Sequence, residues 1–223
     1  MVKVKICGIT NLEDGLAAID AGADMLGFNF YRSSPRYIEP TSAKSIIEAL
    51  RSHTATTSRP VSMVGVFVDE SSSEVSRIAD EVDLDGLQLH GDETVEYVRS
   101  LRQLSPIRFL IKAIGTDSPI RPSTWRKCSP DALMIDSLDP RLRGGTGKVA
   151  DWTAAKRIVE QFPRVFLAGG LSAENVIAGI EAVQPYAVDA CSSLEISPGR
   201  KSATRMKDFV AAVRTAKLGS DRK

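Results

Sequence analysis

The sequence has no long hydrophobic run. No stretch reaches the roughly 18 consecutive apolar residues that a membrane-spanning helix needs. The first residues, MVKVKI, contain no apolar segment of the kind that a secretory signal peptide carries. We therefore expect a cytoplasmic protein that has no membrane partner.

Cysteine and histidine are also scarce, with three and two residues among 223. Cys7, Cys128 and Cys191 are odd in number, widely spaced and outside any CxxC pair, which argues against a disulfide framework or a zinc knuckle. Two histidines offer little support for a metal cluster. We expect Cys128 and Cys191 to be small buried apolar residues.

An excess of either charge is missing as well. The 29 lysines and arginines nearly balance 28 aspartates and glutamates, which leaves a formal net charge of +1. This balance gives no electrostatic case for a nucleic-acid partner. Any anion that the protein binds must be held by a local site.

What the sequence does contain is a regular alternation of strand-like and helix-like segments. Short apolar or alternating runs occupy residues 2–9, 25–30, 62–68, 84–90, 108–114, 132–137, 164–170 and 186–192. Segments with helical spacing separate them. Eight such units predict an α/β fold, a single-domain (β/α)8 TIM barrel over residues 1–223 whose last few residues form a disordered tail. A doubly wound open sheet alternates in the same way and is the structural alternative. The segment between Ile114 and Ala132 is the least periodic unit and predicts a short or irregular turn.

Several of these runs carry polar residues on one face near their ends. In KVKICGIT, Lys5 and Cys7 alternate with Val4 and Ile6. The full set is Lys5, Cys7, Gln88, His90, Lys112, Asp136 and Asp189. Active sites of barrels lie at the carboxyl ends of the strands, so we expect these side chains to converge there. The alternative is that each is satisfied separately inside the barrel.

Two glycine-rich stretches follow late strands. RGGTGK covers residues 143–148, and LAGGLS covers residues 167–172, where a helix is expected to begin near Ser172 or Ala173. Glycines let backbone N–H groups approach an anion, and a helix start adds a positive end. Together with CSSLEISPG after the last strand, they predict a phosphate site. Its expected residues are Gly145, Thr146, Gly147, Gly169, Gly170, Ser192 and Ser193.

These motifs, in this order, resemble the phosphoribosylanthranilate isomerase family of tryptophan biosynthesis, and the resemblance covers essentially the whole chain. The segments that carry it are KICGIT, GFNFYRSSPRYI, VGVFVDE, LQLHGDE, RGGTGKVADW, LAGGLSAENV and VDACSSLEISPGRKS.

The resemblance implies an Amadori rearrangement of N-(5-phosphoribosyl)anthranilate without a metal or organic cofactor. It implies that Cys7 is the general base and Asp136 the general acid, and that Arg36 binds the anthranilate carboxylate. Further substrate contacts are expected from Gln88, His90 and Asp189.

These roles require a lowered pKa for Cys7 and a raised pKa for Asp136. A thiol with an ordinary pKa of about 8.5 needs a nearby cation to act as a base, and Lys5 or Lys112 is the candidate. The general acid needs the opposite shift. Burial of Asp136 would raise the pKa of its carboxyl and keep a proton available.

The chain departs from the family pattern at two places. Ser193 stands where a glycine is expected beside the phosphate, and Val149 and Ala150 replace the usual residues after GGTGK.

Two alternative functions stay open. Another phosphosugar barrel enzyme would share the phosphate loops but would need other catalytic groups. A barrel that only binds a phosphorylated metabolite would not require both Cys7 and Asp136. The sequence leaves open whether the protein is a monomer or a homodimer.

Overall fold

The computed structural model describes residues 1–57, 59–115, 122–127, 130–136 and 151–217. Eight parallel strands form a closed barrel in sequence order. They are β1 (Lys3–Cys7), β2 (Met25–Asn29), β3 (Ser62–Phe67), β4 (Gly86–Leu89), β5 (Phe109–Gly115), β6 (Ala132–Asp136), β7 (Val165–Leu167) and β8 (Ala187–Ala190). β8 pairs with β1 in register from Lys3↔Ala187 to Ile6↔Ala190. The predicted barrel is confirmed, and closure between β8 and β1 excludes the open sheet.

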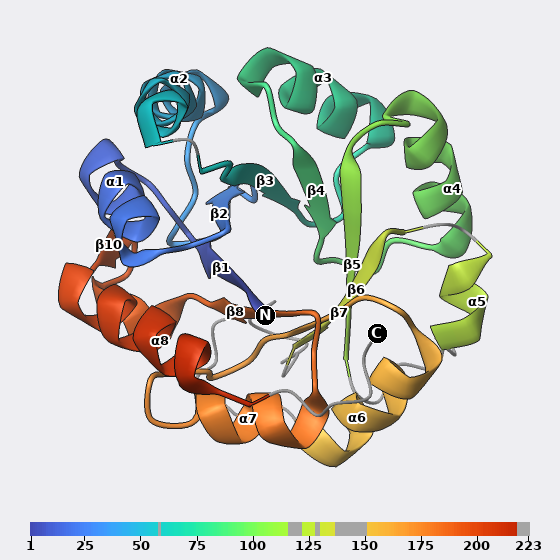
Figure 1. The fold of residues 1–223 in the computed structure, drawn as a ribbon. Coiled ribbons are helices and arrows are strands. Elements are labelled where there is room, and N and C mark those ends of the chain that lie inside the picture. Colours follow the sequence, from blue (N-terminus) through green and yellow to red (C-terminus); the bar gives the residue numbers. More distant parts are fainter. Residues whose placement is uncertain (58, 116–121, 128–129, 137–150, 218–223) are drawn as a thin grey trace.

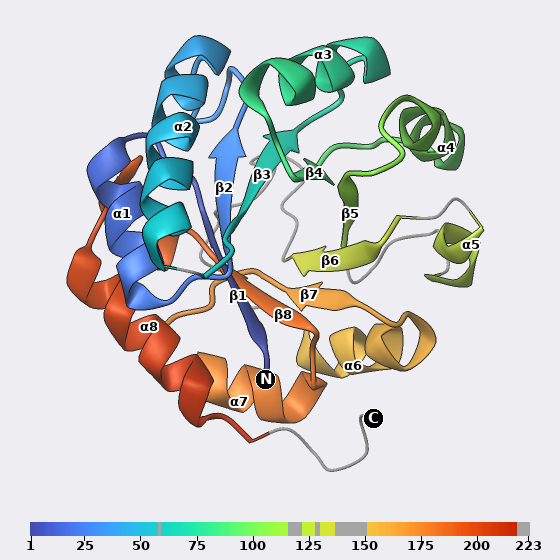
Figure 2. The same cartoon turned by 45° about the horizontal axis from the view of Figure 1, so that its top comes forward.

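Helices surround the barrel as an outer ring (Figure 1). They are α1 (Leu12–Ala21), α2 (Pro40–Thr57), α3 (Ser72–Val82), α4 (Val95–Leu104), α5 (Pro122–Arg126), α6 (Trp152–Gln161), α7 (Val176–Val183) and α8 (Ala203–Thr215). α8 lies between α7 and α1, so the last helix closes the ring beside the first, as the tilted view in Figure 2 also shows.

Local sequence explains where several of these helices begin. Asn11, Ser71, Thr94 and Asp151 each stand before a helix and accept a hydrogen bond from a backbone N–H of its first turn. Such caps satisfy donors that the helix itself leaves unpaired. α5 has only five residues, so the short unit expected between Ile114 and Ala132 is confirmed.

The barrel separates two apolar cores. Between strands and helices lies the larger one, to which β1 contributes Val4 and Ile6. Inside the barrel, a smaller cluster includes Met25, Met134 and Phe166. The alternating side chains of β1 therefore divide as a period of two requires, with Lys5 and Cys7 on the other face from Val4 and Ile6. This division places polar strand-end residues inside the barrel.

A small hairpin follows β8 and was not expected from the sequence. The chain forms the 3-10 turn η1 (Ser192–Leu194), then β9 (Glu195–Ser197) and the antiparallel β10 (Arg200–Lys201). Gly199 turns the chain at a φ of 79°. The segment CSSLEISPG is therefore a phosphate-loop candidate only in its first part, because its second part folds into this hairpin.

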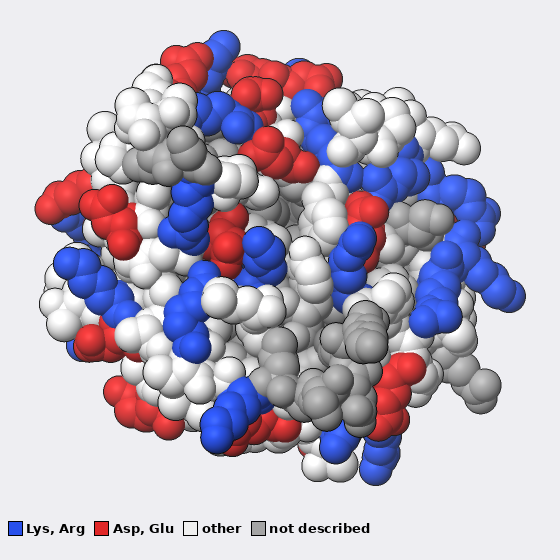
Figure 3. All heavy atoms as spheres, in the orientation of Figure 1, with Lys and Arg blue, Asp and Glu red and all other residues white. Residues whose placement is uncertain are grey.

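Charges of both signs are interspersed on the face shown in Figure 3. No helix among the described residues is both long and apolar enough to cross a membrane. The tail that was expected to be disordered lies largely outside the described residues.

Candidate active site

Buried polar side chains gather at the carboxyl ends of the barrel strands. Lys5, Cys7, Gln88, His90, Lys112, Asp136 and Asp189 are all less than 10% exposed. Hydrogen bonds and short-range charge interactions connect six of them, from Cys7 through Lys5 and Asp189 to Asp136, and on to His90 and Gln88. The expected convergence therefore holds for this group, and Lys112 is the exception described below.

Cys7 ends β1 in a strongly electropositive setting. The Cys191 thiol donates it a hydrogen bond, and this contact, more than any other, holds the pKa of Cys7 well below its usual value. Lys5 and Lys201 act in the same direction, whereas burial opposes them. Gly27 on the neighbouring strand makes space for the Cys7 side chain, because a Cβ at position 27 would lie only 2.7 Å from the Cys7 Sγ. The arrangement favours a thiolate, the form that can take a proton.

Lys5 lies directly beneath this thiol and is completely buried. Its Nζ donates to Asp189 Oδ1 at 2.7 Å. Burial alone would lower the pKa of Lys5, but the charges of Asp189 and Cys7 outweigh it and raise that pKa. Burial also raises the pKa of Asp189 to about 6, against the attraction of Lys5, so this carboxylate is ionised at neutral pH. Lys5 is thus a permanent cation shared by a carboxylate and a thiolate.

Asp136 ends β6 and contacts a histidine from β4's carboxyl end. His90 Nε2 lies 3.1 Å from Asp136 Oδ2, and the Gln88 amide nitrogen lies 2.8 Å from His90 Nδ1. With the Gln88 amide as the donor to Nδ1, the neutral form of His90 carries its N–H at Nε2. This N–H donates a hydrogen bond to Asp136. Gln88 and His90 therefore orient the Asp136 carboxyl, which is 6% exposed.

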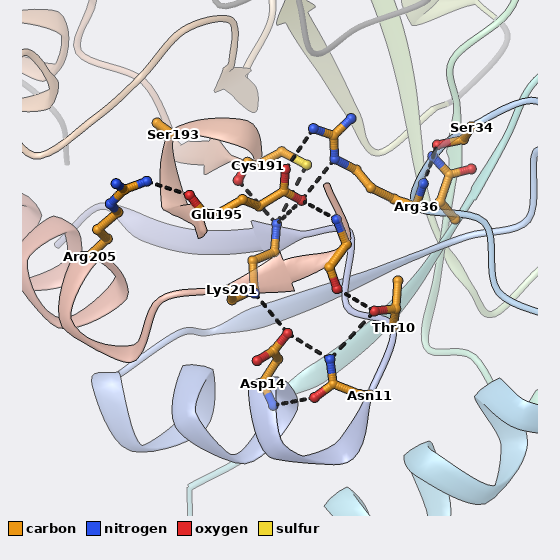
Figure 4. Close-up of polar contacts among 12 residues, drawn as sticks. Thr10, Asn11, Asp14, Ser34, Arg36, Cys191, Ser193, Glu195, Lys201 and Arg205 are labelled. Atoms are coloured by element: carbon orange, nitrogen blue, oxygen red, sulfur yellow. Dashed lines mark hydrogen bonds and ion pairs between the residues drawn. The ribbon is translucent and has the colours of Figure 1, made fainter. Parts of the chain in front are cut away.

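Arg36 enters from the loop between β2 and α2 and is held by Glu195 of β9 (Figure 4). Its Nε and Nη2 donate to the two carboxylate oxygens at 2.9 and 2.7 Å. Lys201 Nζ donates to the same carboxylate at 3.0 Å. Burial would raise the pKa of Glu195, but these two cations outweigh it and hold that pKa below its usual value. Neither of the two Arg36–Glu195 bonds uses Nη1, so Nη1 and the second N–H of Nη2 form another guanidinium edge that does not face Glu195.

Lys112 does not serve the thiol. Its Nζ donates to Glu93 Oε2 at 2.6 Å and to the Gly91 carbonyl at 2.8 Å. Glu93 also accepts the backbone N–H of Gly91 and of Asp69, so the pair fixes the loop after β4. The choice that the sequence left open between Lys5 and Lys112 therefore falls on Lys5.

Part of the expected phosphate site lies around a cavity of about 40 Å³. Gly169 and Gly170 adopt φ angles of 84° and 61°, which glycine tolerates best. The lining comprises Asp136, Ala168, Gly169, Gly170, Leu171, Asp189, Ala190, Cys191, Ser192 and Ser193. Two late loops and two strand-end carboxylates therefore share one hollow.

Two details of this region differ from expectation. α7 begins at Val176 rather than near Ser172 or Ala173. Ser172 to Asn175 form a turn closed by the Asn175 N–H on the Ser172 carbonyl, and the Asn175 side-chain amide donates to the Gly170 carbonyl. The Ser193 hydroxyl donates to the Leu171 carbonyl and so ties the loop after β8 to the loop after β7. The serine that replaces an expected glycine thus has a structural contact of its own.

The remaining phosphate candidates, Gly145, Thr146 and Gly147, lie outside the described residues, as do Val149, Ala150 and Cys128. A larger cavity of about 430 Å³ lies elsewhere, between the loops after β2 and β3, and contains none of the predicted site residues.

Glu195, Lys201 and Cys191 were missed as site residues. The Pro198–Gly199 pair is a turn signal that could have predicted the hairpin carrying Glu195 and Lys201. No sequence signal connects Glu195 with Arg36, which stands 159 positions earlier. Cys191 was expected to be an inert buried residue, but it is partly exposed and contacts Cys7.

Fold and site together define a (β/α)8 barrel with buried titratable side chains at the mouth, the layout of barrel enzymes that act on small molecules. Residues 4–212 match the family model "N-(5'phosphoribosyl)anthranilate (PRA) isomerase". The chain belongs to this family.

Individual relatives agree with that assignment. The N-(5'-phosphoribosyl)anthranilate isomerase of Trichlorobacter lovleyi is 40% identical over 216 residues, which are 97% of this chain and all of the relative. The crystal structure of the enzyme from Thermus thermophilus superimposes with a TM-score of 0.83 at 37% identity, over 96% of this chain and 99% of that one. Another solved member, 34% identical with a TM-score of 0.74 over the same shares, is in complex with reduced 1-(o-carboxyphenylamino)-1-deoxyribulose 5-phosphate.

Proposed function

We propose that this protein converts N-(5-phosphoribosyl)anthranilate into 1-(2-carboxyphenylamino)-1-deoxyribulose 5-phosphate, an isomerisation of tryptophan biosynthesis. The observation that carries the proposal is the pairing of a thiolate at the end of β1 with a histidine-bound carboxyl group at the end of β6, at one barrel mouth. A barrel that only binds a metabolite needs neither group. Family membership supplies the substrate.

Asp136 acts first, as the general acid. It gives a proton to the ring oxygen of the ribose as the bond from that oxygen to C1 breaks, and the anilino nitrogen supplies the electron pair that forms the C1–N double bond. The product is an open-chain protonated Schiff base. His90 and Gln88 fix the direction of the Asp136 carboxyl, which general acid catalysis requires.

Cys7 acts second, as the general base. The protonated Schiff base withdraws electrons from C2, so a thiolate suffices to remove the C2 proton. The electron pair of the C2–H bond then forms a C1–C2 double bond, and the π pair of the C1–N double bond returns to nitrogen. The resulting enol-amine gains a proton at C1 and loses the proton of its C2 hydroxyl, which becomes the ketone of the aminoketose. Lys5 stays charged throughout and stabilises the thiolate that this step uses.

Arg36 and the late loops bind the two ends of the substrate. The Nη1–Nη2 edge of Arg36 suits the anthranilate carboxylate, because a guanidinium donates two parallel hydrogen bonds to a planar carboxylate. The 5-phosphate takes the backbone N–H groups of Gly169, Gly170 and the turn at Ser192 and Ser193. Asp189 lies between these ends and holds Lys5 in place.

The proposed phosphate site also includes three residues that lie outside the described part of the chain. Gly145, Thr146 and Gly147 complete the phosphate site in this proposal. The scheme uses only protein side chains and the phosphorylated substrate. A cytoplasmic location, and a monomeric or homodimeric state, stay predictions.

The test is turnover of purified protein with N-(5-phosphoribosyl)anthranilate, followed as loss of the substrate's fluorescence. The expected result is complete, catalytic loss of the signal. The product, an isomer with the same mass as the substrate, is separated by chromatography and identified by deuterium at C2 after reduction with borodeuteride. Stoichiometric binding without turnover would favour the metabolite-binding alternative. Turnover of a different phosphosugar alone would favour another barrel enzyme.

A further inference from the structure

Cys7 and Cys191 form a pair of neighbouring thiols that the isomerisation does not require. β1 and β8 pair in register up to Ile6↔Ala190, so the next residue of each strand is a cysteine. Adjacent strands lie about 4.8 Å apart, which falls within the roughly 4.4–6.8 Å separation of Cα atoms in disulfides. The Cys191 thiol is also the largest influence that lowers the pKa of Cys7. Two sulfur atoms therefore meet at the mouth of the barrel.

The backbone around the pair leaves it room to adjust. Cys191 lies beyond the last paired residue of β8, at φ −133° and ψ −82°, so the strand ladder does not hold it. Gly8 follows Cys7 without a side chain, and a Cβ built on it would lie 3.1 Å from the Cys191 Sγ. A small movement at Cys191 can therefore change the sulfur–sulfur separation without breaking a strand.

Two lysines give the pair its reactivity. Lys5 lies beneath Cys7, and Lys201 Nζ lies 3.7 Å from Cys191 Sγ. Cationic surroundings favour the thiolate, which is the form that oxidants attack. The contact with Cys191 and the charges of both lysines lower the pKa of Cys7. The contact with Cys7 and burial raise the pKa of Cys191 against the charge of Lys201, so Cys191 stays a protonated neighbour. One sulfur is thus prepared as the nucleophile and the other as its partner.

Small molecules can reach the pair. Cys191 is partly exposed and lines the same 40 Å³ cavity as Asp136 and Gly170. Cys7 is 8% exposed. A peroxide is smaller than the substrate for which the site is proposed, so it can enter wherever the substrate does.

We propose that Cys7 and Cys191 are an oxidation site, at which a peroxide closes the two thiols into a disulfide and reversibly removes the group assigned as the base. In the first step the Cys7 thiolate attacks one oxygen of hydrogen peroxide, the O–O bond breaks, and the released hydroxide takes a proton to become water. Cys7 is then a sulfenic acid.

In the second step the Cys191 sulfur attacks the Cys7 sulfur, and the S–O bond breaks. The Cys191 proton leaves with the hydroxyl group as a second water. Two thiols and one peroxide thus give one disulfide and two waters. A dithiol reductant reverses the reaction by thiol–disulfide exchange. The loss of activity rests on the proposed role of Cys7, whereas the disulfide itself does not.

The direct experiment is peptide mapping under non-reducing conditions after treatment with hydrogen peroxide. We expect a peptide that contains both Cys7 and Cys191 and has lost two hydrogen atoms, and we expect dithiothreitol to abolish it. Cys191→Ser and Cys7→Ser must each prevent this cross-link. Cys128→Ser is the matched control, because it removes the third thiol of the chain and must leave the cross-link intact.

Activity provides the second readout, measured for each variant against its own untreated sample. Peroxide should inactivate the unmodified protein at least tenfold, and dithiothreitol should restore it. In Cys191→Ser the loss should become irreversible at high peroxide, because no second thiol intercepts the sulfenic acid before further oxidation.

Three results would overturn the proposal. They are absence of the cross-linked peptide despite oxidation of Cys7, a cross-link that needs Cys128 instead, or inactivation of Cys191→Ser at high peroxide that dithiothreitol still reverses completely. If the isomerase function itself failed, no turnover would be seen before oxidation, yet the peptide map would still decide whether the thiol pair forms.

Discussion

Glu195 holds Arg36 through two parallel hydrogen bonds of 2.9 and 2.7 Å. The same carboxylate accepts Lys201 Nζ at 3.0 Å and the backbone N–H of Gly199 at 3.2 Å. Arg36 belongs to the loop after β2, whereas Glu195 belongs to the hairpin after β8. The proposed carboxylate site is therefore oriented by a part of the chain that is remote in sequence.

This relationship predicts that Glu195→Gln impairs binding more than chemistry. A neutral amide accepts only one of the two Arg36 hydrogen bonds, so the guanidinium loses its fixed direction. We expect KM to rise about tenfold, the effect of about 1.4 kcal/mol, with a smaller change in kcat. Glu39→Gln is the control, because Glu39 faces exposed Arg32 across 3.5 Å. A fall in kcat at unchanged KM would argue against the positioning role.

The phosphate site makes a separate prediction. Inorganic phosphate should inhibit competitively, because it occupies the backbone N–H groups proposed at Gly169, Gly170 and the turn after β8. The measurement is the apparent KM at increasing phosphate, with chloride at equal ionic strength as the control. If phosphate affected the rate no more than chloride does, the placement of the phosphate group would be wrong.

A third prediction concerns Asp136. Asp136→Asn keeps the size of the side chain but removes the proton that ring opening needs, so kcat should fall at least about 10²-fold. The melting temperature should change little. The matched control is Asp131→Asn, just before the other end of the same strand, where the carboxylate binds Arg102 and the Leu110 N–H.

For Asp131→Asn we expect the reverse pattern, a lower melting temperature with a nearly normal kcat for the folded protein. Should Asp136→Asn lose stability while its folded fraction stayed active, Asp136 would be a structural residue.

The sequence predicted the barrel because its information is local and repeated. Each apolar run and each helical segment carries its own period, and eight repeats of the pattern leave few folds to choose from. Polar residues at strand ends were predictable for the same reason, since alternation along a strand decides which side chains share a face. Cys7 and Asp136 reach the mouth through this rule alone.

Contacts between distant loops were not predictable in this way. Lys112 and Lys5 look equivalent in the sequence, and only the position of Glu93 shows that Lys112 is already paired. Glu195 meets Arg36 because a hairpin folds back over the mouth, which depends on three-dimensional packing. The partnership of Cys191 with Cys7 follows from strand register, which becomes definite only once β8 pairs with β1.

The Cys7 thiol should lose its proton at a lower pH than an ordinary cysteine does. The Cys191 hydrogen bond and Lys5 lower the pKa of Cys7, and a base works only above its pKa, so reactivity should persist well below pH 8.5. The measurement is the rate of Cys7 alkylation by iodoacetamide against pH, read on the Cys7 peptide. Cys191→Ala should move the curve to higher pH, whereas Cys191→Ser keeps a hydrogen-bond donor and should move it less. A wild-type midpoint at or above 8.5 would contradict the assignment.

The central claim is that the Cys7 thiolate removes the C2 proton of the substrate, and the most direct test compares Cys7→Ser with the unmodified protein in the fluorescence assay. A serine hydroxyl is a far poorer base, so kcat should fall on the order of 10²–10⁴-fold. KM, the melting temperature and the affinity for a reduced product analogue should stay nearly unchanged. Near-normal turnover by Cys7→Ser would contradict the account, because another group would then have to take the proton.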